Sequence, residues 1–249
     1  MLITEMILVA LQSVRANLFR AFLTMLGIII GVASVITMIA IGSGARAAVD
    51  EQIDALGASV LSVRAGSFMQ MGVARSAATL TIDDATAIAR DTPSVRAVVP
   101  EIGGQQQIKN GNRNENLRVV GVSANFAEVL GHELAAGRLF SNADDASRRT
   151  VAVLGSGVPA KLGSSSGAIV GQTVYIKGLA FEVVGVLAEK GASGFRNVDE
   201  QIWIPFYTAR YRVYGTAQID TISAQMAPGV SVERAIVEIE RVMRRQHQI

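Results

Sequence analysis

The longest apolar run of the chain lies near its start, over residues 21–41, and no ionisable side chain lies between Arg20 and Arg46. A helix that spans a membrane needs roughly 20 apolar residues, whereas the core of a secretory leader has about 7 to 15. We therefore expect a transmembrane helix over residues 21–41. The sequence Ala45, Arg46, Ala47 fits an A-x-A cleavage pattern, so a cleaved leader stays as the alternative.

The charges on either side of this run predict its orientation. Arg15 and Arg20 precede it, whereas Arg46 is followed by the acidic residues Asp50, Glu51 and Asp54. Positive residues next to a span tend to stay on the cytoplasmic side. We therefore expect a cytoplasmic N-terminus, with everything after residue 41 outside, in a periplasm or an extracellular space.

The segment before the run, residues 1–20, has an amphipathic pattern. One helical face carries the apolar side chains Ile7, Leu8, Leu11, Val14 and Leu18. This spacing predicts a short helix that lies along the cytoplasmic membrane surface with its apolar stripe in the lipid boundary. A helix from the core of a soluble protein is the alternative.

The segment after the run, residues 42–57, continues a helical stripe through Val49, Ile53 and Leu56. Gly57 then offers a C-terminal stop. At about 1.5 Å per residue, this stalk would extend roughly 24 Å beyond the membrane. Gly42 and Gly44 lie at the start of this stalk, and glycine is a poor helix former. A hinge at these residues is therefore the alternative to a rigid rod.

Within the apolar run, Gly27 and Gly31 form a G-x-x-x-G motif. Two glycines four residues apart leave a flat strip on which a second helix can approach closely, and this predicts helix packing in the membrane. The same motif also occurs by chance in glycine-rich apolar segments, so an unpartnered surface is the alternative.

The rest of the chain alternates between strand and helix patterns. Strand patterns occur in "SVLSVRAG", "SVRAVVPEI", "NLRVVGVS", "RTVAVLGS" and "QIWIPF". Thr81 stands three residues before Asp84, which is typical of a helix start, and Lys177 and Gly178 between two apolar runs predict a hairpin. Near the end, Ser231 should cap a helix with the apolar stripe Val232, Ile236, Ile239 and Val242 or Met243.

These patterns predict an α+β fold. The simplest arrangement is a split α/β domain, residues 58–121 and 216–249, whose halves flank an inserted small β-rich subdomain over residues 122–215. The sequence has no cysteine, so no disulfide bond holds the exported part together. The net charge is +2 and the basic residues are scattered, which argues against nucleic-acid binding.

The sequence holds little that points to catalysis. No Gly-Lys-Ser or Gly-Lys-Thr triplet ends a glycine-rich turn, so ATP hydrolysis would need another domain or chain. Gly155 and Gly157 lack the third glycine of a dinucleotide site and predict a structural turn. His132 and His247 have no histidine or cysteine at ligand spacing, so we expect no metal site.

Two other groups of side chains have structural explanations. The adjacent carboxylates Asp83 and Asp84, and likewise Asp144 and Asp145, stand where helices should begin, so capping explains them better than acid–base chemistry. The aromatic side chains around Pro205 should fill a core and not a binding site, namely Trp203, Phe206 and Tyr207. We therefore expect no catalytic, cofactor or metal site, and a protein that is not an enzyme.

Six segments, in the same order, resemble the MacB-like permeases of the macrolide-exporter group of ABC transporters. They are "VRANLFRAFLTMLGIIIGVASVITMIAIGSGA", "VVGVSANFAEVLGHELAAGRLF", "VAVLGS", "GQTVYIKGLAFEVVGVLAEKG", "IWIPFYTA" and "APGVSVERAIVEIERVMRRQH". The resemblance implies a first membrane helix followed by an extracytoplasmic core, in which a porter-like α/β subdomain is interrupted by a small β subdomain. It further implies homodimers in the bacterial inner membrane that couple ATP hydrolysis by an ABC ATP-binding subunit to movement outside, often with a periplasmic adaptor protein.

Permeases of this group have three further membrane helices after the core, and members with a fused ATPase carry it before the first span. We therefore expect the sequence to be a fragment or the product of a truncated gene. A permease subunit for export or mechanotransmission is the favoured function. A single-span extracytoplasmic sensor or scaffold is the alternative, and a cleaved, secreted binding protein is the third class.

Overall fold

The computed structural model describes residues 6, 18–55, 60–64, 69–70, 73–74, 79–193 and 196–247. The chain divides into two compact units, residues 1–55 and residues 56–249. We call them the helical unit and the outer unit.

The helical unit contains one long helix, α2 (Leu18–Ala55). Its hydroxyl groups bond to carbonyls in the preceding turn: Ser34 Oγ donates to the carbonyl of Ile30 at 2.6 Å and Thr37 Oγ1 to that of Ala33 at 2.7 Å. These bonds satisfy hydroxyls that would otherwise be unpaired on an apolar helix. The helix continues through Gly42–Gly44, where Ser43 Oγ donates to the carbonyl of Ala40.

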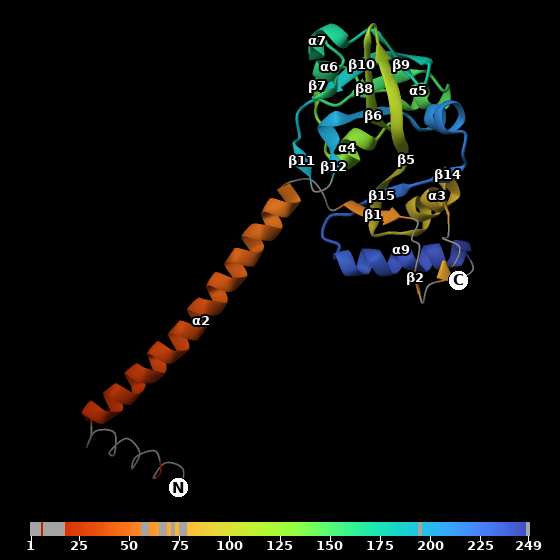
Figure 1. Ribbon diagram of the computed structural model, residues 1–249. Coiled ribbons are helices and arrows are strands. Elements are labelled where there is room, and N and C mark those ends of the chain that lie inside the picture. Colours follow the sequence, from red (N-terminus) through yellow and green to blue (C-terminus); the bar gives the residue numbers. More distant parts are fainter. Residues whose placement is uncertain are drawn as a thin grey trace. The chain divides into compact units, whose positions relative to one another are not determined.

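The outer unit combines one large sheet with short helices (Figure 1). Its helices are α3 (Ile82–Asp91), α4 (Phe126–Leu130), α5 (Asn142–Ala146), α6 (Val158–Lys161), α7 (Ser166–Ile169), the 3-10 helix η1 (Val198–Glu200), α8 (Phe206–Thr208), the π-helix η2 (Ala209–Tyr214) and α9 (Val232–His247). The strands of the large sheet are β1 (Val60–Arg64), β5 (Val95–Asn110), β6 (Arg113–Val122), β7 (Leu134–Gly137), β8 (Val151–Leu154), β9 (Thr173–Ile176), β10 (Leu179–Leu187), β13 (Gln201–Pro205) and β15 (Thr221–Met226). Three small pairs complete the described strands: β2 (Met69–Gln70) with β3 (Val73–Ala74), β4 (Leu80–Thr81) with β14 (Gln218–Ile219), and β11 (Ala192–Ser193) with β12 (Arg196–Asn197).

The large sheet has the order β1-β15-β5-β6-β13-β8-β10-β7, and β9 pairs with both β10 and β5. Most neighbours are antiparallel, but β6 with β13 and β8 with β10 are parallel pairs. The mixed α/β fold class is therefore confirmed.

Strand β5 connects the two ends of this sheet. Near its start it pairs with β15, with Val95 opposite Met226, and near its end it pairs with β9, with Ile108 opposite Ile176. Along most of its length it also forms a hairpin with β6. One sheet thus runs across the position of the expected boundary at residue 122, and the division into an α/β part and an inserted part stays a prediction.

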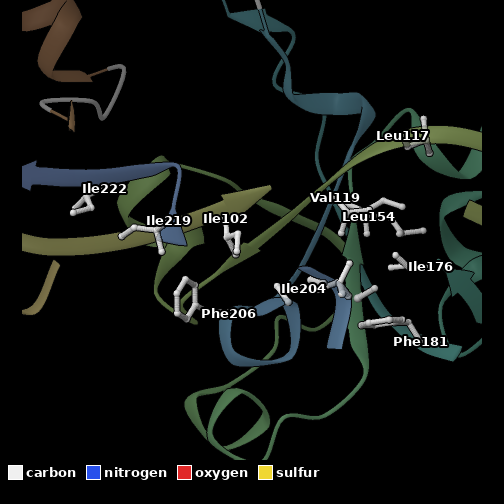
Figure 2. Close-up of a cluster of buried hydrophobic side chains, with 14 of the residues drawn as sticks. Ile102, Leu117, Val119, Leu154, Ile176, Phe181, Ile204, Phe206, Ile219 and Ile222 are labelled. Atoms are coloured by element: carbon white, nitrogen blue, oxygen red, sulfur yellow. The ribbon is translucent and has the colours of Figure 1, made fainter. Parts of the chain in front are cut away.

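The core lies on both faces of the sheet because side chains alternate along each strand. In β8, Ala152 and Leu154 contribute to one buried cluster, whereas Val151 and Val153 contribute to the other. Figure 2 shows part of the first cluster, with labelled side chains from β5, β6, β8, β9, β10, β13, β14, β15 and α8. Helix η2 packs closely on β6, since a Cβ atom on Gly121 would lie 2.1 Å from that of Ala209.

Several local predictions are confirmed. Thr81 and Asp84 form a reciprocal capping box at the start of α3, and Ser141 and Asp144 form another at the start of α5. Strands β9 and β10 form the expected hairpin, whose turn residues Lys177 and Gly178 have φ values of 51° and 82°.

The predicted apolar stripe of the last helix is partly wrong. Figure 1 shows α9 beside α3, and the buried side chains of α9 are Ala235, Ile239 and Val242. Val232 and Ile236 are instead exposed. The small Ala235 allows the helix to lie close to its neighbours, so the buried face is rotated by about one residue from the face that the large side chains predicted.

Candidate functional site

Helix α2 is the first candidate for a functional element. Among the described residues, it is the one helix whose length and composition would allow it to cross a membrane, over Leu18–Gly44. None of its most apolar stretch is buried within the chain. The apolar stretch is therefore exposed among the described residues.

Gly27 and Gly31 lie in the apolar part of α2. A Cβ atom at either position would meet no other atom within 4 Å. The chain itself thus does not require glycine at these positions, and their packing role stays a prediction.

The other residues expected to act through this helix are only partly described. Arg20 lies exposed in its first turns, and Val49 and Ile53 lie within its helical backbone. Arg15 and Leu56 lie outside the described residues. The flanking and stalk roles of these residues stay predictions.

A second candidate is a cavity of about 280 Å³ in the outer unit, which we call the His132 pocket. His132 contacts Trp203 at 5.1 Å between ring centroids, and Phe126 lies 5.9 Å from Trp203. The remaining lining residues are Val60, Ser62, Glu101, Val120, Leu130, Lys190, Val198, Gln201 and Ser223. The lining therefore combines aromatic and apolar side chains with polar ones.

The charged groups of this pocket are fixed by backbone hydrogen bonds. Lys190 Nζ donates to the carbonyl of Gly131 at 2.9 Å, and burial lowers the pKa of this amine. Burial tends to raise the pKa of Asp199, but the N–H groups of Lys190 and Gly191, at 2.9 and 2.8 Å, stabilise its carboxylate and lower the pKa overall. Ser223 Oγ donates to Glu101.

His132 is neutral at physiological pH. Burial lowers its pKa to about 4, and the positive charge of Lys190 acts in the same direction. Among the described residues, no serine or threonine hydroxyl is hydrogen-bonded to this ring. The pocket can therefore accept an apolar group with a polar end, but it does not present a nucleophile activated by a base.

One member of each carboxylate pair caps a helix as predicted. Asp84 and Asp144 cap α3 and α5, and Asp145 Oδ1 accepts the N–H of Tyr207 at 2.8 Å. His247 Nε2 lies 3.1 Å from Asp84 Oδ1. Within the described residues, no group of three His, Asp or Glu side chains could hold a metal ion.

Gly155 lies at a structural turn. A Cβ atom there would lie 2.4 Å from the carbonyl oxygen of Asp199, and its N–H donates to the carbonyl of Gln201 at 2.8 Å. The backbone of η1 and β13 passes too close for any other residue. Gly155 therefore lies in a structural turn, as predicted, and this turn packs against η1 and β13.

The aromatic residues around Pro205 separate into three environments. Trp203 and Phe206 are buried, and they belong to the clusters on opposite faces of the sheet. Tyr207 is 37% exposed, so its assignment to the core was wrong. A helical turn begins at Phe206, and this turn directs Tyr207 outward.

The His132 pocket could not be found from the sequence. His132, Lys190 and Trp203 come from a loop, a second loop and strand β13, and His132 lies more than fifty residues before the other two. No local spacing connects them. The features of the sequence that pointed to these residues were the single tryptophan, Trp203, and the absence of another histidine near His132.

The comparison with known families identifies the chain. The profile of the MacB-like periplasmic core domain matches residues 21–242. The chain belongs to this family. The MacB-like core domain thus includes the outer unit and most of α2, and the resemblance to MacB-like permeases is confirmed.

Individual MacB-like relatives are similar over nearly the whole chain. The macrolide export ATP-binding/permease protein MacB of Bdellovibrio bacteriovorus is 32% identical over 241 residues, which cover 96% of this chain and 37% of that protein. The pyoverdine export ATP-binding/permease protein PvdT of Pseudomonas entomophila is 36% identical over 236 residues, which cover 93% of this chain and 35% of that protein. The chain thus spans little more than a third of the length of these relatives.

Solved structures share the MacB-like fold. The periplasmic region of MacB from Actinobacillus actinomycetemcomitans aligns with a TM-score of 0.67 and 20% identity, over 80% of this chain and 88% of that one. The extracellular domain of the ABC-type transporter YknZ from Gram-positive bacteria aligns with a TM-score of 0.58 and 19% identity, over 68% of this chain and 85% of that one.

Proposed function

We propose that the chain is the first membrane helix and extracytoplasmic core of an ABC transporter permease. It couples ATP hydrolysis by a partner ATP-binding subunit or domain to a conformational change outside the membrane, for export or for mechanotransmission. The names of the relatives support this proposal, since they combine an ATP-binding part with a permease. The flanking charges support an inner-membrane location with a cytoplasmic N-terminus and a periplasmic or extracellular core.

The observation that carries the proposal is the continuity of α2. Its helical backbone passes from the apolar stretch through Gly42–Gly44 to Ala55. A continuous helix transmits displacement along its axis, whereas a flexible tether does not. The eleven residues from Ala45 to Ala55 add roughly 16 Å of helix beyond the apolar stretch. These residues make up most of the stalk expected over residues 42–57.

The proposed assembly is a homodimer in which two copies of α2 pack through Gly27 and Gly31. Some relatives are named for export of macrolides or pyoverdine, and we infer cargo of this general kind for the export mode. In that mode a periplasmic adaptor protein completes the path outward.

The test interrupts the stalk without touching the outer unit. The double substitution Ala47→Pro with Ala48→Gly breaks helix geometry, because proline lacks a backbone donor and clashes with the preceding turn. In cells with the complete transporter, we expect macrolide export to be lost while the ATP-binding subunit stays bound and the outer unit stays folded. Copurification and Trp203 fluorescence check the latter two points.

The matched control is Ala47→Gln with Ala48→Gln, which keeps a good helix former at both positions. It should export at the wild-type rate. Export that survives the proline–glycine break would contradict transmission through α2.

A further inference from the structure

A cavity of about 420 Å³ opens on the outer unit beside the end of α5 and the start of β10. Its lining includes Arg148, Arg149 and Arg212, together with hydroxyl groups of serine and threonine. The acidic residue in this lining is Glu182, which lies 3.8 Å from Arg149. Arg149 also pairs with the buried Asp144 at 3.0 Å. The cavity therefore has a surplus of positive charge.

Two guanidinium groups that line this cavity, and a third on the neighbouring Arg210, have no carboxylate partner among the described residues. Within the described part of the chain, no carboxylate pairs with Arg148, Arg210 or Arg212. Guanidinium groups match carboxylates with two parallel hydrogen bonds. These three side chains are thus available to an anionic group from another molecule.

Two tyrosines extend the basic surface beyond the cavity. The guanidinium carbon of Arg148 lies 4.2 Å from the centroid of the Tyr211 ring, and that of Arg210 lies 5.2 Å from it. Tyr207 stacks on Tyr211, with 15° between the rings. Tyr211 is 50% exposed. We call this set the arginine–tyrosine surface: Arg148, Arg149, Tyr207, Arg210, Tyr211 and Arg212.

The two segments that form this surface are fixed against each other. Tyr207 N donates to Asp145 Oδ1 at 2.8 Å, and Thr208 Oγ1, which is fully buried, donates to the carbonyl of Arg149 at 2.9 Å. The surface is therefore organised before any partner binds, which lowers the entropy cost of association.

Two backbone features shape this surface. Arg148 has a φ of 52° just after α5, where glycine would be free of strain. Arg210, Tyr211 and Arg212 lie on η2, a π-helix, a conformation that is rare and is frequent at functional sites. Both features place charged or aromatic side chains of the surface outside regular α-helix or strand.

We propose that the arginine–tyrosine surface binds an acidic segment of a partner polypeptide. Carboxylates of the segment pair with Arg148, Arg210 and Arg212, and its backbone and apolar atoms lie against Tyr207 and Tyr211. An extended segment fits better than a small anion, because the surface continues from the cavity across two exposed rings. Arginine and tyrosine are also enriched among the residues that dominate protein–protein binding.

The test uses the full chain in detergent and a fluorescein-labelled synthetic peptide of alternating glutamate and glycine. We expect the peptide to bind at low salt and to bind less tightly as salt screens the charges. The double variant Arg148→Gln with Arg212→Gln should weaken binding by about tenfold or more, as expected when charged hydrogen bonds are lost. This binding does not depend on transport activity, so its result tests the surface independently of the proposed function.

The control variant Arg113→Gln with Arg241→Gln removes the same charge from exposed positions outside the surface. It should bind the peptide as the wild type does. Equal weakening by both variants, or equal binding of a glutamine–glycine peptide, would overturn the proposal. Tighter binding of inorganic pyrophosphate, with the same dependence on Arg148 and Arg212, would also overturn it in favour of a small-anion site.

Discussion

Titratable side chains in the outer unit avoid an unpaired buried charge in two different ways. Asp144 is ionised: its pKa is lowered to about 2, first by the N–H of Ser141 and then by Arg138, with burial acting in the opposite direction. His132 is neutral because burial outweighs the attraction of Asp199. A carboxylate with several donors can be buried as an ion, whereas a ring packed against Trp203 must lose its charge.

The neutral state of His132 predicts a loss of stability in acid. The pKa is about 4 in the folded chain and 6.5 in its ordinary range, so the unfolded chain binds the proton more readily between these values. Stability should be complete above pH 6.5 and should fall as the pH drops towards 4. The expected loss at pH 5 is at most about 2 kcal/mol, since solvent reaches part of the ring.

Urea unfolding of the full chain in detergent, followed by fluorescence of Trp203, the single tryptophan, measures this loss. His132→Phe and His132→Gln differ in polarity but neither titrates, so both should remove this part of the pH dependence. If the free energy of unfolding changed with pH equally in these variants and in the wild type, His132 would not be the source of the acid sensitivity.

Elements that carry their own pattern could be predicted, and those that depend on neighbours could not. The apolar run gave α2, and the pair Thr81 and Asp84 gave the start of α3, because each signal is complete within a few residues. Between β6 and β9 the start of α5 was predicted from its carboxylates, but α4, α6 and α7 were missed, since these helices have only four or five residues each. Helices of this length show no periodicity and form only where packing stabilises them.

At the scale of one element, α2 should associate with a second copy through its glycines. Gly27→Leu with Gly31→Leu should lower the resonance-transfer signal between labelled chains in membranes, because leucine keeps the two backbones apart. These positions have no neighbours within the chain, so the change should leave the helix itself intact.

Ala33→Leu is the matched control, because Ala33 is also small and exposed but lies on another face of α2. It should associate as the wild type does. Unchanged association of the glycine variant would show that these residues are not the contact.

At the scale of the whole molecule, the order of strands in the sheet could not be predicted from the sequence. Antiparallel neighbours such as β5 and β6 follow from a short hairpin, but the parallel pairs β6–β13 and β8–β10 join segments that are far apart along the chain. The His132 pocket and the arginine–tyrosine surface depend on this order, because their members meet only when the sheet has formed. Of the candidate sites, the sequence therefore predicted the residues of α2 alone.

The outer unit should fold without α2. Most of the exposed large apolar side chains among the described residues belong to α2, whereas the outer unit buries its own core on both faces of the sheet. A fragment of residues 59–248 should therefore be a soluble monomer, and reducing agents should not affect it because it has no cysteine. Light scattering after gel filtration and circular dichroism measure these properties. Aggregation in every detergent would argue against this boundary.

Strand β5 limits how such domains can be recombined. Ile108 of β5 and Val119 of β6 are fully buried and lie opposite Ile176 of β9 and Ile202 of β13, although both precede residue 122. A chimera that exchanged residues 122–215 alone would pack side chains from another protein against the original β5–β6 hairpin. Side chains of the wrong volume would then meet in a close-packed core. The transplantable module is therefore the β5–β6 hairpin together with the strands that cover it. Gene fusions between relatives should tolerate crossovers at the ends of this hairpin better than crossovers within its partners.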